Sequence, residues 1–494
     1  MVSNKIFGTD GIRDIANSGW LRPEFLVKLG KIIGSDIINQ SFKKRVIIGR
    51  DTRLSGEMIE CALSAGLISS GVDIIKAGVI STPGLAYLTK CGKYSLGIMI
   101  SASHNPADYN GIKLFLSNGL KITTPIEEKI EKHIFSDIGA CLTGHPVRRW
   151  AVPPQCLSEV CLPPVARLAL RGGRYRKKSV HKTLSAPKGS VLEISKRDLL
   201  QKYIDDTIKI VLGSKINKWA SGMKIVIDSA NGSLFEIAQA LFKKIGATVT
   251  TIHNSADGVN INHRCGSLHP EVIRRKVLAT KSHIGFSFDG DGDRVILVDE
   301  KGNIRDGDFV LYIAASYFKK HRLLEKNTIV GTIMTNSALE KLLAERDIKL
   351  IRTPVGDKYV LDQMLKNNLV LGGEPSGHII FSDYSKNGDG LITALIMLKI
   401  IKEEQKSLFK LAEALQKYPQ IIVNVPVKSK PPLEEIKPIQ KKTAEINKIL
   451  NNQGRLVLRY SGTESLARIM MEGKNLHQIK SLAKDLSKTI ENIL

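Results

Sequence analysis

The sequence predicts an α/β fold built from three similar domains in tandem, followed by a smaller α+β domain. Short apolar runs of strand length alternate with amphipathic stretches of helix length. This is the rhythm of β–α–β units and of mixed, largely parallel sheets. The rhythm recurs three times along the 494 residues and changes near residue 418. A chain of this length is expected to form roughly three or four domains.

The first domain is predicted over residues 1–212. The run RVIIGRD at 45–51 precedes a helical pattern over 55–70, and VDIIKAGV at 72–79 precedes a helix that starts at Thr82. Proline directly after that residue suits the first turn of a helix. The pattern therefore predicts two successive strand–helix pairs.

An insertion interrupts this domain at residues 141–190. It contains ten lysines and arginines against one acid, and it includes three of the six cysteines. It has little helical or strand periodicity, and a structureless loop of this length is unusual inside a compact domain. We expect a disordered insertion, or a short helix on a tether, and favour this over an RNA-binding arm.

Three further domains are predicted over 213–303, 304–417 and 418–494. The second holds MKIVIDSANG, ATVTTIH and HIGFSFDGDGDRVILVDEKG, and the third holds TIVGTIM and KLIRTPVGDKYV around a helix from Ser337. The last has strand patterns in YPQIIVNVPVK and GRLVLRYSGTESLARIMMEG, a helix around 434–450 and a closing helix. The similarity of the first three units predicts an internally repeated architecture around one cleft.

The net charge of +25 is spread along the chain. The sequence lacks a basic stripe with interleaved aromatic residues, which a single-strand nucleic-acid binder would need. We expect no specific nucleic-acid partner, although the charge would help to attract a phosphorylated metabolite.

The cysteines and the N-terminus indicate a cytoplasmic protein. No CxxC pair or metal-ligand spacing is present, so reduced thiols are expected. The sequence also has no apolar run of membrane-spanning length and no apolar signal-peptide core, so no membrane partner is expected. The cysteines are Cys61, Cys91, Cys141, Cys156, Cys161 and Cys265.

The segment IMISASHNPADYNGIKLF at 98–115 places Ser103 and His104 just after a predicted strand. Ligands bind at the carboxyl ends of strands in α/β sheets. Ser103 could therefore be a nucleophile, but Ser, Asn and Pro are also ordinary turn residues.

The strongest chemical signal is DGDGDR, directly after the apolar run IGFSF. The glycines allow Asp289, Asp291 and Asp293 to converge, with Arg294 immediately after them. Converged carboxylates repel one another unless a cation lies between them, and their oxygen ligands suit Mg²⁺.

RYSGTESLAR is a candidate anion site. A guanidinium, two hydroxyl groups and a flexible backbone could hold phosphate, and a helix that begins there would add its N-terminal dipole. The alternative is a turn with a capping box. The residues concerned are Arg459, Ser461, Gly462, Thr463 and Arg468.

A third loop, GGEPSGHIIF, places Glu374, Ser376 and His378 between glycines before a strand. These side chains could donate to and accept from sugar hydroxyl groups. Together, a cation loop, a phosphate site, a polyol loop and a serine loop describe phosphoryl transfer on a sugar.

The ordered motifs SASHNP, DGDGDR, GGEPSGH and RYSGTE resemble those of the α-D-phosphohexomutase family. The resemblance covers nearly the whole chain outside 141–190. The forms FGTDGIR and ISASHNP look most like the branch that acts on glucosamine phosphates. The alternative is a phosphomannomutase/phosphoglucomutase of the same family, and a binding protein that has lost activity is a more distant one.

The resemblance implies that Ser103 is phosphorylated and that, with Asp289, Asp291 and Asp293, it binds one Mg²⁺. Phosphoserine would convert glucosamine 6-phosphate into a 1,6-bisphosphate intermediate and then into glucosamine 1-phosphate. This product would feed the synthesis of UDP-N-acetylglucosamine and of peptidoglycan.

The resemblance also implies roles for residues around this centre. Glu374 and Ser376 match sugar-hydroxyl contacts, and the RYSGTESLAR residues match the distal phosphate site. The C-terminal domain would close as a lid, and a homodimer is possible. Phosphoryl transfer needs its charge neutralised and a proton carried. Candidates for charge neutralisation are Arg13, Lys113 and Arg294, and candidates for the proton are His104 and Lys113.

Overall fold

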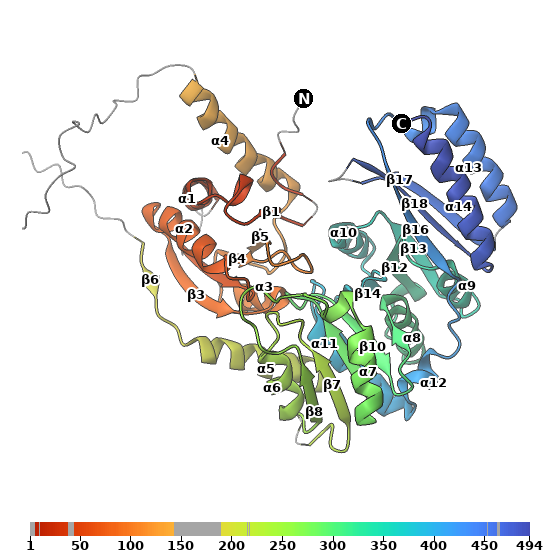
Figure 1. The fold of residues 1–494 in the computed structure, drawn as a ribbon. Helices are drawn as coiled ribbons and strands as arrows, with labels where there is room; N and C mark the ends of the chain where they lie inside the picture. Colours follow the sequence, from red (N-terminus) through yellow and green to blue (C-terminus); the bar gives the residue numbers. More distant parts are fainter. Residues whose placement is uncertain are drawn as a thin grey trace, which may run out of the picture.

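The structure is a computed structural model in which four α/β units follow one another around an arc (Figure 1). The predicted insertion lies almost wholly outside the described residues, as do Gly462 and Thr463. The structure describes residues 5–8, 10–37, 44–142, 189–214, 216, 218–451, 453–461 and 465–494. Within these ranges, no helix is long and apolar enough to cross a membrane.

The first unit is a six-stranded sheet in the order β1-β5-β4-β2-β3-β6. Strands β2, β3, β4 and β6 are parallel, whereas β5 runs antiparallel to both β4 and β1. Its strands are β1 (Ile12–Ile15), β2 (Arg45–Arg50), β3 (Asp73–Val79), β4 (Leu96–Ile100), β5 (Tyr109–Leu116) and β6 (Val191–Leu192). Its helices are α1 (Pro23–Ile32), α2 (Gly56–Ser69), α3 (Thr82–Cys91), α4 (Thr124–Leu142) and α5 (Lys196–Leu212).

The second unit has the strand order β11-β10-β9-β7-β8. Strand β7 is parallel to β8 and β9, and β10 returns antiparallel to β9. Its strands are β7 (Lys224–Asp228), β8 (Thr248–Ile252), β9 (Ile284–Phe288), β10 (Val295–Asp299) and β11 (Ile304–Arg305), and its helices are α6 (Ile237–Lys244) and α7 (Glu271–Thr280).

The third unit repeats this pattern in the order β13-β12-β14-β15. In each unit, a parallel strand turns directly into an antiparallel neighbour, as β4–β5, β9–β10 and β14–β15. The predicted repeat is therefore confirmed. The elements of the third unit are β12 (Thr328–Thr332), β13 (Lys349–Thr353), β14 (Leu371–Gly373), β15 (Ile379–Phe381), α8 (Gly307–Lys320), α9 (Ser337–Ala344), α10 (Asp357–Asn367), α11 (Gly390–Glu404) and α12 (Leu408–Ala412).

The C-terminal unit is an antiparallel sheet, β16-β18-β17, covered by two helices. The prediction of a helix that begins within RYSGTESLAR is wrong. Residues from Leu466 onward form a strand that pairs with both neighbours, because alternate side chains bury against α13 and α14. The elements are β16 (Gln420–Pro426), α13 (Lys437–Leu450), β17 (Gly454–Tyr460), β18 (Leu466–Gly473) and α14 (Leu476–Glu491).

The first three units share one continuous apolar core. Phe115, Phe286 and Phe381, one from each unit, belong to the same buried cluster. Helix α5, which follows the insertion, contributes Tyr203 to this cluster, and the Tyr203 hydroxyl donates to Asp389 Oδ2 at 2.9 Å at the start of α11. These units therefore form one scaffold.

The C-terminal unit has its own core and meets the third unit through polar contacts. The Ser337 amide donates to Glu472 Oε1 at 3.0 Å, and Arg455 Nη2 donates to the carbonyl of Thr335 at 2.9 Å. A polar interface between separate cores is the kind that permits domain movement.

Candidate active site

Three loops meet because they occupy equivalent places in the three repeated units. The loop after β4 carries Ser103, the loop after β9 carries the aspartates, and the loop after β14 carries Glu374. Ser103 Oγ donates to Asp289 Oδ2 at 2.7 Å, and His378 Nδ1 lies 3.7 Å from Asp293 Oδ2. The structure thus joins all three loops into one site.

Ser103 is held in an uncommon backbone conformation. Its φ is +52°, in the left-handed region, and the residue is buried. Its amide donates to Ser101 Oγ at 2.9 Å, while His104 Nδ1 lies 3.3 Å from its Oγ. A non-glycine residue in this region costs about 1–3 kcal/mol, so the surrounding structure must impose it.

Arg53 imposes the shape of this loop. Its guanidinium is fully buried and donates to the carbonyls of Ser103 at 3.0 Å, Asn105 at 2.8 Å and Tyr109 at 2.9 Å, and also to the carbonyl of Pro106. Its Nε donates to Asp51 Oδ2 at 2.9 Å. One cation therefore gathers four loop carbonyls.

Two further residues support the same loop. Asn262 Nδ2 donates to the carbonyls of Ser103 at 2.9 Å and Asn105 at 3.1 Å, and Ser101 Oγ donates to Asp51 Oδ2 at 2.6 Å. Asp51, Arg53 and Asn262 were not predicted as site residues from the sequence. The run DTR at 51–53, directly after β2, was the available signal, since it lies at the same sheet edge as Ser103.

The three aspartates form a buried cluster whose donor atoms lie within 4.8 Å of one another. Burial, together with the negative charges of Asp293 and Asp291, raises the pKa of Asp289 well above its usual range. Asp291 Oδ1 and Asp293 Oδ1 have no hydrogen-bond partner among the described residues. Buried, partly orphaned carboxylate oxygens are the donor set that a hard divalent cation requires.

Lys113 lies against this cluster as a buried cation. Its Nζ is 2.9 Å from both Asp291 Oδ2 and Asp10 Oδ2, and 3.6 Å from Asp293 Oδ2. Burial acts to lower the pKa of Lys113, but the Asp10, Asp291 and Asp293 carboxylates outweigh it and raise the pKa. Lys113 therefore stays charged at neutral pH.

His104 has the opposite electrostatic character. Burial, followed by the positive charges of Arg294 and Arg13, lowers the pKa of His104 to about 4. At neutral pH its imidazole is uncharged and one ring nitrogen can accept a proton. Of the two predicted proton carriers, only His104 has a form suited to accept one.

The other predicted cations also lie at this centre. Arg13 contacts Asp10, which in turn contacts Lys113. Arg294 Nε is 3.8 Å from Asp293 Oδ1. Burial acts to lower the pKa of Arg294, but the surrounding carboxylates raise it, Asp293 most strongly.

The third loop places its predicted polar side chains next to one another. Ser376 Oγ lies 3.2 Å from Glu374 Oε2, and the Gly356 amide donates to Glu374 Oε1 at 2.8 Å. His378 lies between Asp293 and Asp357, with its Nε2 3.9 Å from Asp357 Oδ2. Glu374 therefore retains acceptor capacity beside a donor hydroxyl, as recognition of a polyol requires.

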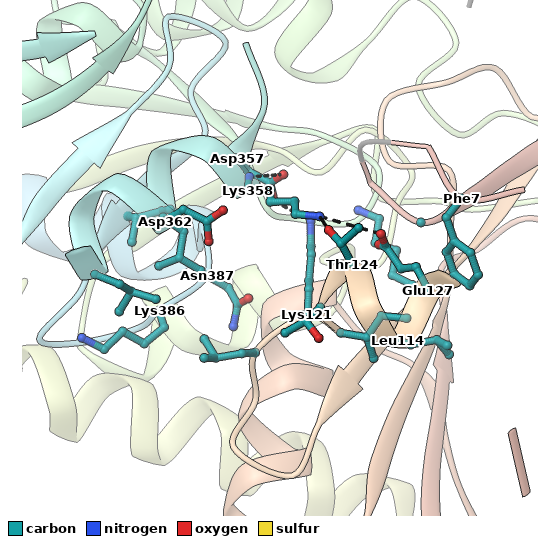
Figure 2. Close-up of a pocket in the computed structure, with 18 of the residues that line it drawn as sticks. Phe7, Leu114, Lys121, Thr124, Glu127, Asp357, Lys358, Asp362, Lys386 and Asn387 are labelled. Carbon is teal, nitrogen blue, oxygen red and sulfur yellow. Dashed lines mark hydrogen bonds and ion pairs between the residues drawn. The ribbon is translucent and has the colours of Figure 1, made fainter. Parts of the chain in front are cut away.

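A cavity of about 330 Å³ lies where the first and third units meet (Figure 2). Lys358 Nζ donates to Thr124 Oγ1 at 2.6 Å, and Lys121 pairs with Asp357 across the same junction. Lys113 and His378 also line it. The cavity therefore adjoins the centre formed by the serine and aspartate loops.

The predicted phosphate residues gather in the C-terminal unit. Arg459 on β17 and Arg468 on β18 are directly paired in the sheet and line a cavity of about 290 Å³. Burial and the neighbouring Arg468 lower the pKa of Arg459. Ser461 is buried beside them, whereas Gly462 and Thr463 lie outside the described residues. Two adjacent guanidinium groups are an arrangement that suits a doubly charged anion.

The sequence matches all four domains of the phosphoglucomutase/phosphomannomutase family. Residues 4–138 match alpha/beta/alpha domain I and residues 201–302 match domain II. Residues 306–418 match domain III and residues 422–489 match the C-terminal domain.

Several relatives match over their full length. The chain is 40% identical to phosphoglucosamine mutases of Alkaliphilus oremlandii and Clostridioides difficile over 99% of both chains. It is 40% identical to that of Chlamydia trachomatis serovar D, over 99% of this chain and 97% of the relative.

Solved structures share the fold at lower identity. A phosphoglucomutase/phosphomannomutase family protein from Burkholderia thailandensis has 22% identity and a TM-score of 0.74, over 100% of this chain and 98% of that one. Aspergillus fumigatus N-acetylphosphoglucosamine mutase, solved with GlcNAc-6P and magnesium, has 16% identity and a TM-score of 0.60, over 98% and 95%.

Proposed function

The chain belongs to the α-D-phosphohexomutase family of isomerases, and we propose that it interconverts glucosamine 6-phosphate and glucosamine 1-phosphate through a phosphoserine at Ser103. The observation that carries this proposal is the 2.7 Å contact between Ser103 Oγ and Asp289 within a buried aspartate cluster. The full-length relatives named phosphoglucosamine mutase support the choice of substrate. The cytoplasmic location stays a prediction.

Asp289, Asp291 and Asp293 would hold Mg²⁺ together with an oxygen of the phosphoserine. The donor set consists only of oxygens and suits this cation better than a softer one. When bound, the cation would neutralise negative charge on the phosphoryl group during transfer. Lys113 and Arg294 would add fixed positive charge at the same place, because both stay protonated.

The proposed reaction has two phosphoryl transfers. In the first, the sugar O1 forms a bond to the phosphorus while the bond to Ser103 Oγ breaks, which yields the 1,6-bisphosphate and a free serine. In the second, the 6-phosphoryl group bonds to Ser103 Oγ and leaves the sugar O6. Uncharged His104, whose Nδ1 lies 3.3 Å from Ser103 Oγ, is positioned to carry the proton in both transfers. In the first, the proton lost by O1 passes to the departing serine oxygen, and in the second, the serine proton passes to the departing O6.

Binding at either end of the sugar requires a second anion site and hydroxyl contacts. Glu374 and Ser376 would bind the sugar hydroxyl groups, and Arg459 and Arg468 would bind the phosphate that is not reacting. The separate core of the C-terminal unit supports its role as a lid that closes over this phosphate.

Initial rates test the substrate. The enzyme is charged with the matching hexose 1,6-bisphosphate and supplied in turn with glucosamine 6-phosphate, glucose 1-phosphate and mannose 1-phosphate. We expect the glucosamine ester to be turned over fastest. Faster turnover of glucose or mannose phosphates would assign the chain to the phosphomannomutase/phosphoglucomutase branch instead.

A further inference from the structure

A second cluster of metal-ligating side chains lies in the second unit, away from the aspartate loop. Asp228 ends β7, His253 follows β8, and Cys265 lies in the connection to α7. Their donor atoms all lie within 4.8 Å of one another. These residues have no metal-ligand spacing in the sequence, and parallel pairing of β7 with β8 helps to bring them together.

The donor atoms lie close enough together to bind one cation. His253 Nδ1 lies 3.0 Å from Asp228 Oδ1, and both Asp228 and Cys265 are buried. Within the described residues, the buried Nδ1 makes no hydrogen bond outside this cluster, and its contact is the one to Asp228. The amides of Ala230 and Gly266 donate to Asp228 Oδ1 and Oδ2 at 2.9 and 3.0 Å, which orients the carboxylate as outer-sphere contacts orient metal ligands.

We propose that Asp228, His253 and Cys265 form a binding site for a zinc-class divalent cation. A carboxylate oxygen, an imidazole nitrogen and a thiolate sulfur suit Zn²⁺, whereas Mg²⁺ prefers oxygen ligands alone. On binding, a bond forms between the cation and Cys265 Sγ, and the thiol proton is released to solvent. Three protein ligands leave the fourth position to water.

This cation would fasten a loop that supports the serine. His253 and Cys265 flank residues 254–264, so both ends of that loop would be joined to Asp228. The loop carries Asn262, which donates to the Ser103 and Asn105 carbonyls. Its Gly258 carbonyl accepts a hydrogen bond from the amide of Leu54 at 2.9 Å. A ligand that binds only the folded loop stabilises it, so the site has a structural role behind the reactive serine.

Cobalt tests this site without reference to activity. Metal-free full-length protein is titrated with Co²⁺ in excess Mg²⁺, and the thiolate-to-cobalt charge-transfer band is recorded. We expect one equivalent to produce the band and Zn²⁺ to displace it. The aspartate loop has no thiolate and cannot give this signal.

Variants locate the ligands. C265S and H253N are each expected to weaken binding by at least about 10- to 100-fold. Asn tolerates the positive φ of 48° at residue 253, so H253N keeps the backbone. The control C61S/C91S, which alters two exposed free thiols, should retain the band. The proposal is overturned if the wild type gives no band, or if either single variant binds Co²⁺ with wild-type affinity.

Discussion

Replacing Arg53 should impair catalysis beyond what its loss of stability explains. This side chain donates five hydrogen bonds, of which those to the carbonyls of Ser103 and Asn105 bracket the reactive serine. Ser103 keeps a left-handed backbone that needs such support. In Arg53→Met the side-chain volume is nearly kept while every donor is removed.

The size of the effect follows from the two hydrogen bonds next to the serine. A hydrogen bond from a charged donor contributes about 1.5–3 kcal/mol, so the productive loop conformation loses about 3–6 kcal/mol. Asn262 still donates to the same two carbonyls, which favours the lower end. Since 1.4 kcal/mol is tenfold, we expect kcat to fall by at least about 100-fold.

The assay separates positioning from stability. Steady-state kinetics give kcat and KM, mass spectrometry gives the phosphorylated fraction of Ser103, and thermal unfolding gives stability. Arg305→Met is a matched control. Arg305 in β11 pairs with the buried Asp299 of β10 at 2.8 Å and does not contact the serine loop. Losing one partner of a buried ion pair costs about 3–5 kcal/mol, and the partly exposed Arg305 should lie at the lower end of this range.

Arg53→Lys adds a second comparison, since it keeps the positive charge beside Asp51 but cannot reach all four carbonyls. We expect a smaller loss of stability than in Arg53→Met, because fewer buried carbonyls lose their donor, and a reduced kcat. The reasoning is refuted if Arg53→Met loses stability as Arg305→Met does, yet keeps kcat within about threefold of the control and a normal phosphorylated fraction of Ser103.

Three other predictions concern the metal, the phosphate and pH. Asp291→Asn should abolish turnover, and so should chelation of divalent cations from the wild type. Added Mg²⁺ should restore turnover of the chelator-treated wild type but not of the variant. Arg459→Met should raise KM for the hexosamine phosphate by about 10- to 100-fold in steady-state kinetics, because a charged hydrogen bond to phosphate is lost; an unchanged KM would contradict this. Burial raises the pKa of Asp389 from 3.8 to about 6. The folded state therefore binds a proton that the unfolded state releases, and the free energy of unfolding should fall by up to about 3 kcal/mol as pH rises from about 4 to 6. Urea unfolding across that range should show a slope that Asp389→Asn reduces by this amount, while Asp308, whose pKa burial also raises to about 6, keeps its own contribution.

Residues that follow an apolar strand directly could be predicted from the sequence. Ser103 and the three aspartates follow β4 and β9, and the strand rhythm alone places these loops at one edge of their sheets. Glu374 follows β14 in the same way. Such positions depend on local pattern and on a repeated topology.

Residues that act through distant contacts could not be predicted in this way. Arg53 binds backbone carbonyls of residues 103–109, and carbonyls carry no sequence signal. Asp228, His253 and Cys265 come together only through sheet pairing. The pattern after Arg459 resembled a helix start, but pairing of β18 with both its neighbours outweighs that local preference.

Mass spectrometry of the purified protein tests the central claim most directly. Intact mass and peptide mapping across residues 98–113 would locate any phosphoryl group. The account predicts one phosphoryl group on Ser103, which is lost when the protein is incubated with a hexosamine phosphate and Mg²⁺. An unmodified Ser103 that no hexose 1,6-bisphosphate can phosphorylate would contradict it.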